Sequence, residues 1–161
     1  MSSEPCRLFV FRHGEASFRA ATDFERLLTP NGVRQTEKVV AHLSEAFNDL
    51  DQVSTELWAS PLYRAQQTAQ LVSSHLDLPV QTRDYLTPDD HPVAVVDNLI
   101  AAKSTPRNLI LVSHMPLVSG LIAYLQEGHV RPQYSFQTSE CVVLEGSDML
   151  PGCMTIKQSF Y

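Results

Sequence analysis

The residues best suited to chemistry in this chain are two arginines and two histidines, Arg12, His13, Arg64 and His114. Arg12 and His13 end an apolar run at residues 8–11, whereas Arg64 and His114 follow other apolar runs, where the chain turns into a helix. Guanidinium groups bind oxyanions through paired N–H donors, and the amides at a helix start add partial positive charge. The four side chains therefore predict a cationic cage for a dianionic phosphoryl group.

A metal site is the competing interpretation of the two histidines. Histidine-based metal sites usually show a spacing such as H-E-x-x-H or include adjacent carboxylate or thiolate ligands. Neither pattern accompanies His13 or His114, and the neighbouring arginines would repel a cation. We therefore expect no metal at these residues.

Length and composition predict a single domain over residues 1–161, with a disordered N-terminus at 1–6. The 161 residues, 43% of them hydrophobic, suffice for one core. The sequence has neither a signal-peptide pattern at its start nor an apolar stretch long enough to span a bilayer, so we expect a cytoplasmic protein without a membrane partner. The formal net charge of -6 argues against nonspecific nucleic-acid binding. Three cysteines without C-x-x-C spacing indicate neither a disulfide framework nor a zinc site.

Apolar runs predict the strands of the fold. The runs at 8–11 and 108–112 are typical of strands buried on both faces, and the second ends at Ser113-His114. Weaker strands are expected within 53–59 and at 80–86. Short runs at 141–144 and 154–156, separated by glycine and proline, predict antiparallel or edge strands.

Two helix starts carry the same signal, a hydroxyl residue followed by proline. Thr29-Pro30 and Ser60-Pro61 each predict an N-cap and a first helical residue. Further helices are expected at 93–102 and 117–125. Strands alternating with helices over the first 125 residues predict an α/β three-layer sandwich, in which helices flank a mostly parallel central sheet. The carboxyl ends of such strands share one crevice, which would gather the four candidate residues.

Five segments of the chain carry a more specific pattern. They are Phe11-Arg12-His13-Gly14-Glu15-Ala16; Asp23 with Arg26, Leu28-Thr29 and Gly32; Ser60-Pro61-Leu62 with Arg64-Ala65 and Gln67-Thr68; Leu86-Thr87-Pro88; and Ser113-His114 with Pro116-Leu117-Val118. In this order they resemble the histidine phosphatase (phosphoglycerate-mutase-like) superfamily, and within it the small SixA-type phosphohistidine phosphatases.

This resemblance implies a phosphoglycerate-mutase-like fold and a role for each cage residue. His13 would be the nucleophile that forms a phosphohistidine intermediate, while Arg12, Arg64 and His114 would hold the phosphoryl group, with Arg26 as a further phosphate-binding candidate. The family requires no metal and no organic cofactor. Elementary chemistry agrees, because nearby cations lower the pKa of a histidine, keep it nucleophilic and stabilise the charge of the transition state.

The proton donor is the least defined part of the pattern. Many members of the superfamily place a glutamate after the third strand, where this chain has Tyr85, and an asparagine six residues after the nucleophile, where it has Arg19. Both departures, together with the short length, argue against a sugar-phosphate mutase. Four carboxylates are candidate general acids: Asp23, Glu15, Asp89 and Asp90. Asp23 is preferred because it lies in the matched loop.

We therefore predict a phosphatase that hydrolyses protein phosphohistidine through phospho-His13. An imidazole bound to phosphorus leaves more easily than an alkoxide, so such a substrate needs little proton donation. The expected partner is a phosphohistidine-bearing protein such as a histidine phosphotransfer domain. Two alternatives stay open: a small-molecule phosphomonoesterase of the same superfamily, and a non-catalytic phosphate-binding regulatory module.

Overall fold

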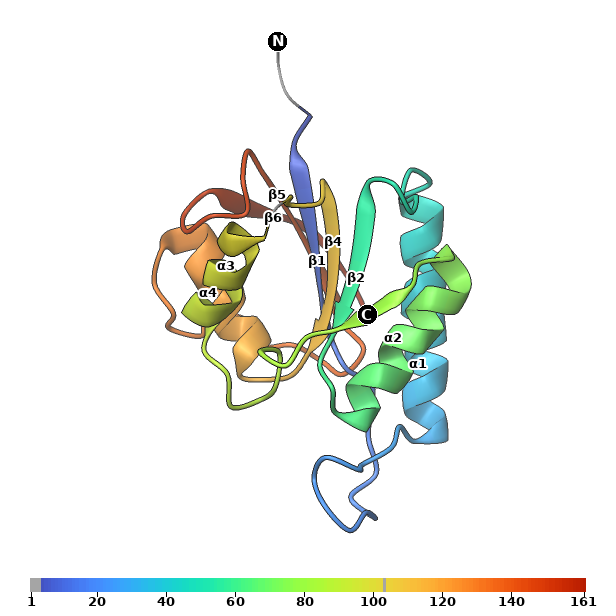
Figure 1. Ribbon diagram of the computed structural model, residues 1–161. Coiled ribbons are helices and arrows are strands. Elements are labelled where there is room, and N and C mark those ends of the chain that lie inside the picture. The colour runs from blue at the N-terminus through green and yellow to red at the C-terminus, as the bar shows by residue number, and fades with distance from the viewer. Residues whose placement is uncertain (1–3, 103) are drawn as a thin grey trace.

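Strands and helices alternate along the residues that the computed structural model describes, 4–102 and 104–161 (Figure 1). In chain order the elements are β1 (Cys6–Arg12), α1 (Pro30–Ala46), β2 (Thr55–Ala59), α2 (Tyr63–Leu76), β3 (Val80–Thr82), α3 (Pro92–Ala101), β4 (Asn108–Ser113), α4 (Leu117–Glu127), β5 (Cys141–Gly146) and β6 (Met154–Phe160). None of the helices described is long and apolar enough to cross a membrane.

All the strands form one sheet in the order β3-β2-β4-β1-β5-β6. The first four in this order are parallel, whereas β5 is antiparallel to β1 and β6 is antiparallel to β5. Figure 1 shows α1 and α2 on one face of the sheet and α3 and α4 on the other. The predicted three-layer α/β fold with antiparallel C-terminal strands is thus confirmed.

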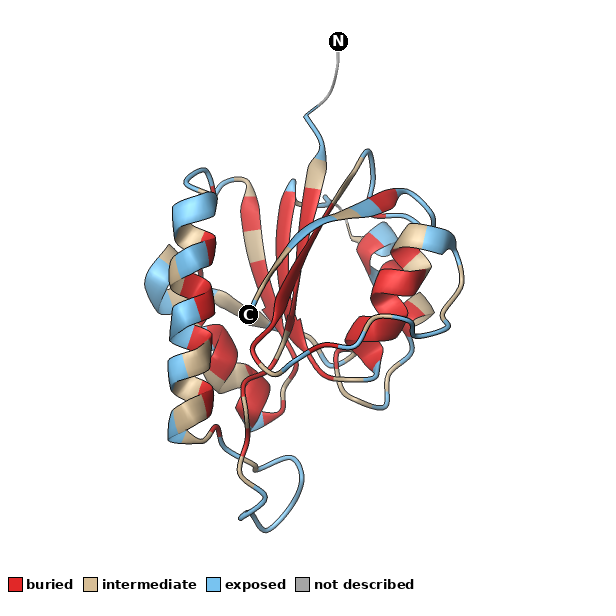
Figure 2. Cartoon of the chain, turned by 180° about the vertical axis from the view of Figure 1, so that it is seen from behind, coloured by how far each residue is buried: buried red, intermediate tan, exposed pale blue. Residues whose placement is uncertain are grey.

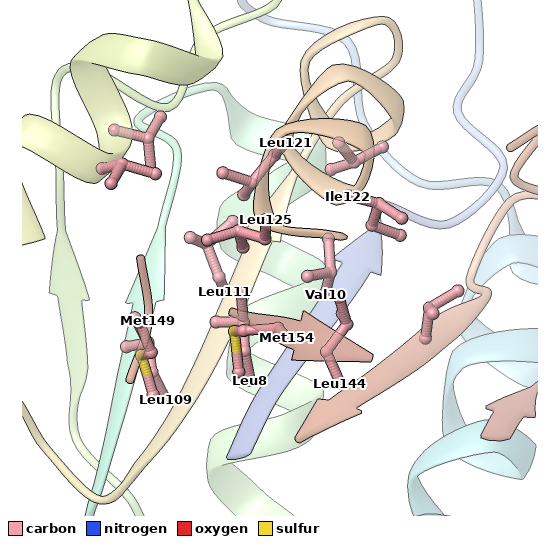
Figure 3. Packing of buried hydrophobic residues seen from close by; sticks show 14 of the residues in the cluster. Leu8, Val10, Leu109, Leu111, Leu121, Ile122, Leu125, Leu144, Met149 and Met154 are labelled. Atoms are coloured by element: carbon pink, nitrogen blue, oxygen red, sulfur yellow. The ribbon is translucent and has the colours of Figure 1, made fainter. Parts of the chain in front are cut away.

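The central strands are buried on both faces because their side chains alternate between two cores. Leu8 and Val10 of β1 pack with residues of β4, β5 and α4 in the core beneath α3 and α4 (Figure 3). Phe9 and Phe11 point the other way, into the core beneath α1 and α2. This alternation explains why β1 reads as an uninterrupted apolar run. In Figure 2 the buried residues lie on the sheet and on the inner helix faces.

Two expectations about local structure were wrong. Helix α2 begins at Tyr63 with Leu62 as its N-cap, so the Ser60-Pro61 signal misplaces the start; the Ser60 hydroxyl pairs instead with a side chain of the site. Strand β3 ends at Thr82 rather than near residue 86. Its partner β2 ends at Ala59, which pairs with Thr82, so no strand residue lies opposite the positions that follow. The segment 1–6 was expected to be disordered: residues 1–3 lie outside the described part, and Cys6 already belongs to β1.

Strand register brings the two histidines together. Arg12 at the end of β1 pairs with Ser113 at the end of β4, so His13 and His114 leave adjacent parallel strands at the same level. Their ring centroids are 5.0 Å apart. The carboxyl edge of the sheet is therefore the candidate reaction site.

Candidate active site

His13 is held as one defined neutral tautomer by its hydrogen-bond partners. Its Nδ1 lies 2.7 Å from the carbonyl oxygen of Gly14, which can only accept, so Nδ1 carries the proton. Its Nε2 accepts a hydrogen bond of 3.3 Å from Arg64 Nε, which can only donate. Nε2 is thus unprotonated and lies against Arg64, and an unprotonated ring nitrogen is the form that a nucleophilic histidine requires.

The surroundings also keep His13 neutral. The ring is 8% exposed, and burial is the main cause that lowers its pKa from 6.5 to about 4. The hydrogen bond to Gly14 opposes this shift, while the charges of Arg64, Arg12 and Arg26 add to it. At neutral pH the imidazole is therefore unprotonated.

Gly14 allows the chain to turn tightly behind His13. A Cβ at this position would lie 2.9 Å from both the carbonyl oxygen of Gly32 and the Thr36 hydroxyl. The Gly14 amide donates to Thr68 Oγ1 at 3.0 Å, which ties the turn to α2. The absence of a side chain here thus permits the close packing of β1's exit against α1 and α2.

Arg64 is the central cation of the site. It lies in the first turn of α2 and is 4% exposed. Besides contacting His13, its guanidinium donates to the backbone oxygen of Asp23 at 2.7 Å and to a carboxylate oxygen of the same residue at 3.2 Å. These bonds fix the planar group beside the Nε2 atom of His13.

His114 is even more deeply buried, at 1% exposure. Its Nε2 lies 2.7 Å from the Ser60 hydroxyl, whereas its buried Nδ1 has no hydrogen-bond partner. Burial, together with the neighbouring His13 and Arg64, holds the pKa of His114 far below its ordinary value. The ring is therefore a neutral, partly unsatisfied polar group within the site.

Arg12 completes the set from the end of β1. Its Nη1 donates to the backbone oxygen of Phe136 at 2.7 Å, and its buried Nε has no partner. Unsatisfied buried polar atoms are rare and often mark a place where a ligand or water completes the bonding. Two such atoms, on Arg12 and His114, thus occur among the four residues that the sequence singles out.

The four candidate general acids have different surroundings. Asp23 lines a cavity of about 320 Å³ together with Asp89, whereas Asp90 binds the amide and hydroxyl of Thr87 within its own turn. Both carboxylate oxygens of Glu15 accept bonds at the start of α1, from Thr29 and Asn31.

Two of these candidates, Asp23 and Glu15, are poor proton donors. Partial burial raises the pKa of Asp23, but hydrogen bonds from Arg26 and Arg64 outweigh it and leave the pKa below its ordinary value. The hydrogen bonds from Thr29 and Asn31 likewise lower the pKa of Glu15. Neither group is therefore protonated at neutral pH.

Arg26 lies within electrostatic reach of the site but is anchored in its own loop. Its guanidinium donates to the carbonyl oxygens of Ser17 and Ala16 and pairs with Asp23 at 3.2 Å. It also stacks on Phe18, with 4.0 Å from its central carbon to the ring centroid. It organises loop 15–28 and contributes positive charge near His13.

The sequence analysis missed the segment between α4 and β5. The buried carboxylate of Glu140 accepts hydrogen bonds from Tyr134 Oη at 2.5 Å and from the backbone amide of Gln137 at 2.7 Å. These bonds hold the segment in a fold that brings the Phe136 carbonyl to Arg12. The backbone continues this support, because the amide of Ser139 donates to the carbonyl of His13 at 3.1 Å. No sequence motif marks these residues. The one sequence signal is an acidic residue, Glu140, directly before the apolar run at 141–144.

Comparison with known proteins gives these residues a family. A model of the histidine phosphatase superfamily (branch 1) matches residues 8–87. The chain is 34% identical over 128 residues to the phosphohistidine phosphatase SixA homolog of Haemophilus influenzae, covering 73% of this chain and 76% of that protein. It is 30% identical over 145 residues to the phosphohistidine phosphatase SixA of Escherichia coli, covering 88% and 87%.

A solved structure agrees with the sequence comparisons. The structure of the protein histidine phosphatase SixA complexed with tungstate matches with a TM-score of 0.80 at 27% identity, covering 96% of both chains. The fold, the site and these relatives together define the class: the chain belongs to the histidine phosphatase superfamily. Within that superfamily its similar relatives are the SixA proteins, and the resemblance inferred from the sequence is confirmed.

Proposed function

We propose that this protein is a phosphohistidine phosphatase that acts on phosphorylated histidine in a protein partner, such as a histidine phosphotransfer domain. The observation that carries the proposal is the neutral His13, whose Nε2 lone pair lies beside Arg64. The names of the two relatives, both phosphohistidine phosphatases, supply the substrate class. The free cysteines Cys6, Cys141 and Cys153 are typical of a reducing compartment and support a cytoplasmic location.

The proposed reaction begins with transfer to the enzyme. Nε2 of His13 attacks phosphorus, the P–N bond of the substrate breaks, and the leaving imidazole keeps the electron pair and takes a proton from solvent. Nδ1–H stays bonded to the Gly14 carbonyl and stabilises the positive charge that develops on the ring. Water then attacks the phosphorus of phospho-His13, its protons pass to the phosphate and to solvent, and the P–N bond breaks with its electron pair returning to Nε2. Inorganic phosphate is released and neutral His13 is restored.

The cage residues stabilise the phosphoryl oxygens in both steps. Arg12 Nε and His114 Nδ1 have no hydrogen-bond partner within the protein and can engage an oxyanion, and Arg64 contributes a guanidinium beside the nucleophile. Arg26 adds charge at longer range. The SixA structure with tungstate supports this view, because tungstate is a tetrahedral oxyanion like phosphate.

The surroundings of the carboxylates favour phosphohistidine over an alkyl phosphate. Asp23, the candidate acid that contacts Arg64, is paired with two arginines and has a lowered pKa, so this carboxylate is a weak source of protons. A good leaving group such as imidazole tolerates this deficiency, whereas an alkoxide does not. The proposed steps use residues of the chain and water, without a metal ion.

The proposal is tested by trapping the intermediate. The protein is mixed with a histidine phosphotransfer domain carrying radioactive phosphohistidine, quenched in denaturant and analysed for acid-labile phosphate on the enzyme. We expect the wild-type protein to carry radioactive phosphate on His13. His13→Ala should carry no label and should not dephosphorylate the domain. Turnover that survives this substitution would refute the nucleophile.

A substrate panel separates the two alternatives from the proposal. Faster hydrolysis of sugar phosphates than of the phosphohistidine protein would support a small-molecule phosphomonoesterase. Binding of phosphate without turnover of any substrate would indicate a regulatory module.

A further inference from the structure

Exposed apolar side chains are concentrated on one part of the surface. Four of the eight large apolar side chains that are exposed among the described residues lie on loop 15–28 or at the first residue of α2. We call these residues the apolar rim: Phe18 (86% exposed), Leu27 (49%), Tyr63 (45%) and Phe24 (44%). Single exposed apolar residues are ordinary, but such a group on one loop is typical of an interaction site.

One side of the rim lines a cavity that lies next to the candidate site. The rings of Phe24 and Tyr63 meet edge to face, with centroids 5.5 Å apart. Phe24 also lines the cavity that Asp23 and Asp89 share, and Asp23 pairs with Arg64 beside the nucleophile. This half of the rim therefore lies next to Arg64, on the side where Asp23 contacts it.

The other side of the rim is fixed to the first by Arg26. This guanidinium stacks under Phe18 at 4.0 Å and pairs with Asp23 at 3.2 Å. The amide of Ser17 donates to the carbonyl of Leu27 at 2.8 Å, so Phe18 and Leu27 extend from adjacent, hydrogen-bonded stretches of the loop. The loop projects beyond the carboxyl edge of the sheet, below α1 and α2 in Figure 1, and most of it is exposed in Figure 2. The rim is thus organised before any partner binds.

We propose that the apolar rim is the docking surface for the protein that carries the phosphohistidine, and that this partner presents apolar side chains around the modified residue. This inference rests on the proposed function and assigns it a surface. His13 and Arg64 are 8% and 4% exposed, so a phosphorylated side chain must project from its own protein to reach them. The partner's surface around that side chain then meets the rim.

The exposure of the rim favours a protein over a small phosphate ester as its partner. A small ester held by the buried His13 and Arg64 leaves Phe18, which is 86% exposed, in water. A protein surface covers Phe18 and Leu27 while its phosphorylated histidine reaches the site. Aromatic and arginine side chains, as found here in the stacked Phe18 and Arg26, are enriched where proteins bind one another.

The test compares two substrates with one pair of substitutions. The double variant Phe18→Ser/Leu27→Ser is assayed on a histidine phosphotransfer domain phosphorylated with phosphoramidate and on the free amino acid phosphohistidine. We expect KM for the phosphorylated domain to rise about tenfold or more, because apolar anchors dominate protein interfaces. We expect kcat/KM for free phosphohistidine to change less than about twofold, because neither side chain lines the cavity.

Val53→Ser is the matched control, since it removes an apolar side chain that is 98% exposed outside the rim. It should leave KM for the phosphorylated domain and kcat/KM for free phosphohistidine unchanged. Equal kinetics of wild type and double variant on the phosphorylated domain would overturn the docking surface while leaving the proposed function intact. A wild type that hydrolyses free phosphohistidine but not the domain would overturn both. Sedimentation showing a wild-type dimer that the double variant abolishes would assign the rim to a second copy of this chain instead.

Discussion

Replacing His13 by asparagine should reduce the loss of unfolding free energy that acidification causes. In the folded chain the pKa of His13 is about 4, mainly because the ring is buried, whereas the ordinary value is 6.5. As the pH falls through this window, the unfolded chain takes up a proton that the folded chain does not, so acidification destabilises the wild type. Between about pH 7.5 and about pH 4.5 this residue alone removes about 2.5 kcal/mol of unfolding free energy.

Asparagine is a suitable probe because its side-chain amide can take over the bond that His13 Nδ1 donates to the Gly14 carbonyl. Urea unfolding of both proteins at the two pH values measures the effect. The acid-induced loss should be smaller in His13→Asn by about 2 to 3 kcal/mol. His75→Asn, at an exposed position of α2, is the control and should match the wild type to within about 0.5 kcal/mol. Equal losses in wild type and His13→Asn would refute the conclusion that the fold keeps this imidazole neutral.

Three further substitutions test other parts of the site. Arg64→Lys should lower kcat on a phosphohistidine protein by about 10² to 10³-fold, because an ammonium lacks the planar fork, and a change of less than about tenfold would contradict this role. Glu140→Gln should lower the unfolding free energy in urea by about 1 to 3 kcal/mol and raise KM, because the new side-chain amide would face the hydroxyl of Tyr134 or the backbone amide of Gln137, both hydrogen-bond donors. Unchanged values would show that this carboxylate does not support the segment that holds Arg12. Gly14→Ala should cost about 1 to 3 kcal/mol in the same assay, since its Cβ would lie 2.9 Å from Gly32 and Thr36 atoms, and full stability would show that these neighbours give way.

Much of the sheet and the cage could be predicted because each depends on short segments. The apolar runs of β1 and β4 have one partner on each side, so their uninterrupted pattern identifies them as central strands. Parallel strands end at one edge, and this geometric rule gathers Arg12, His13 and His114 before any contact is known. Arg64 joins them because the next helix starts at that edge.

The remaining parts depend on tertiary contacts that leave no local pattern. Ser60 followed by proline looks like an N-cap, but its hydroxyl pairs with His114, a partner far along the sequence. Glu140 is a single acidic residue before a strand, and its role follows from the folding of the preceding segment around its carboxylate. The state of Asp23 as an ionised partner of two arginines likewise depends on how loop 15–28 lies against α2.

The pairing of β5 with β1 sets the smallest part of this chain that can work. All four cage residues precede the end of α4, yet a protein stopped there would turn β1 into an open edge strand with unpaired backbone groups. It would also leave the Arg12 guanidinium without the Phe136 carbonyl that holds it. Fragments, fusions and split reporters built on this enzyme should therefore keep residues beyond α4 through β5 joined to the rest.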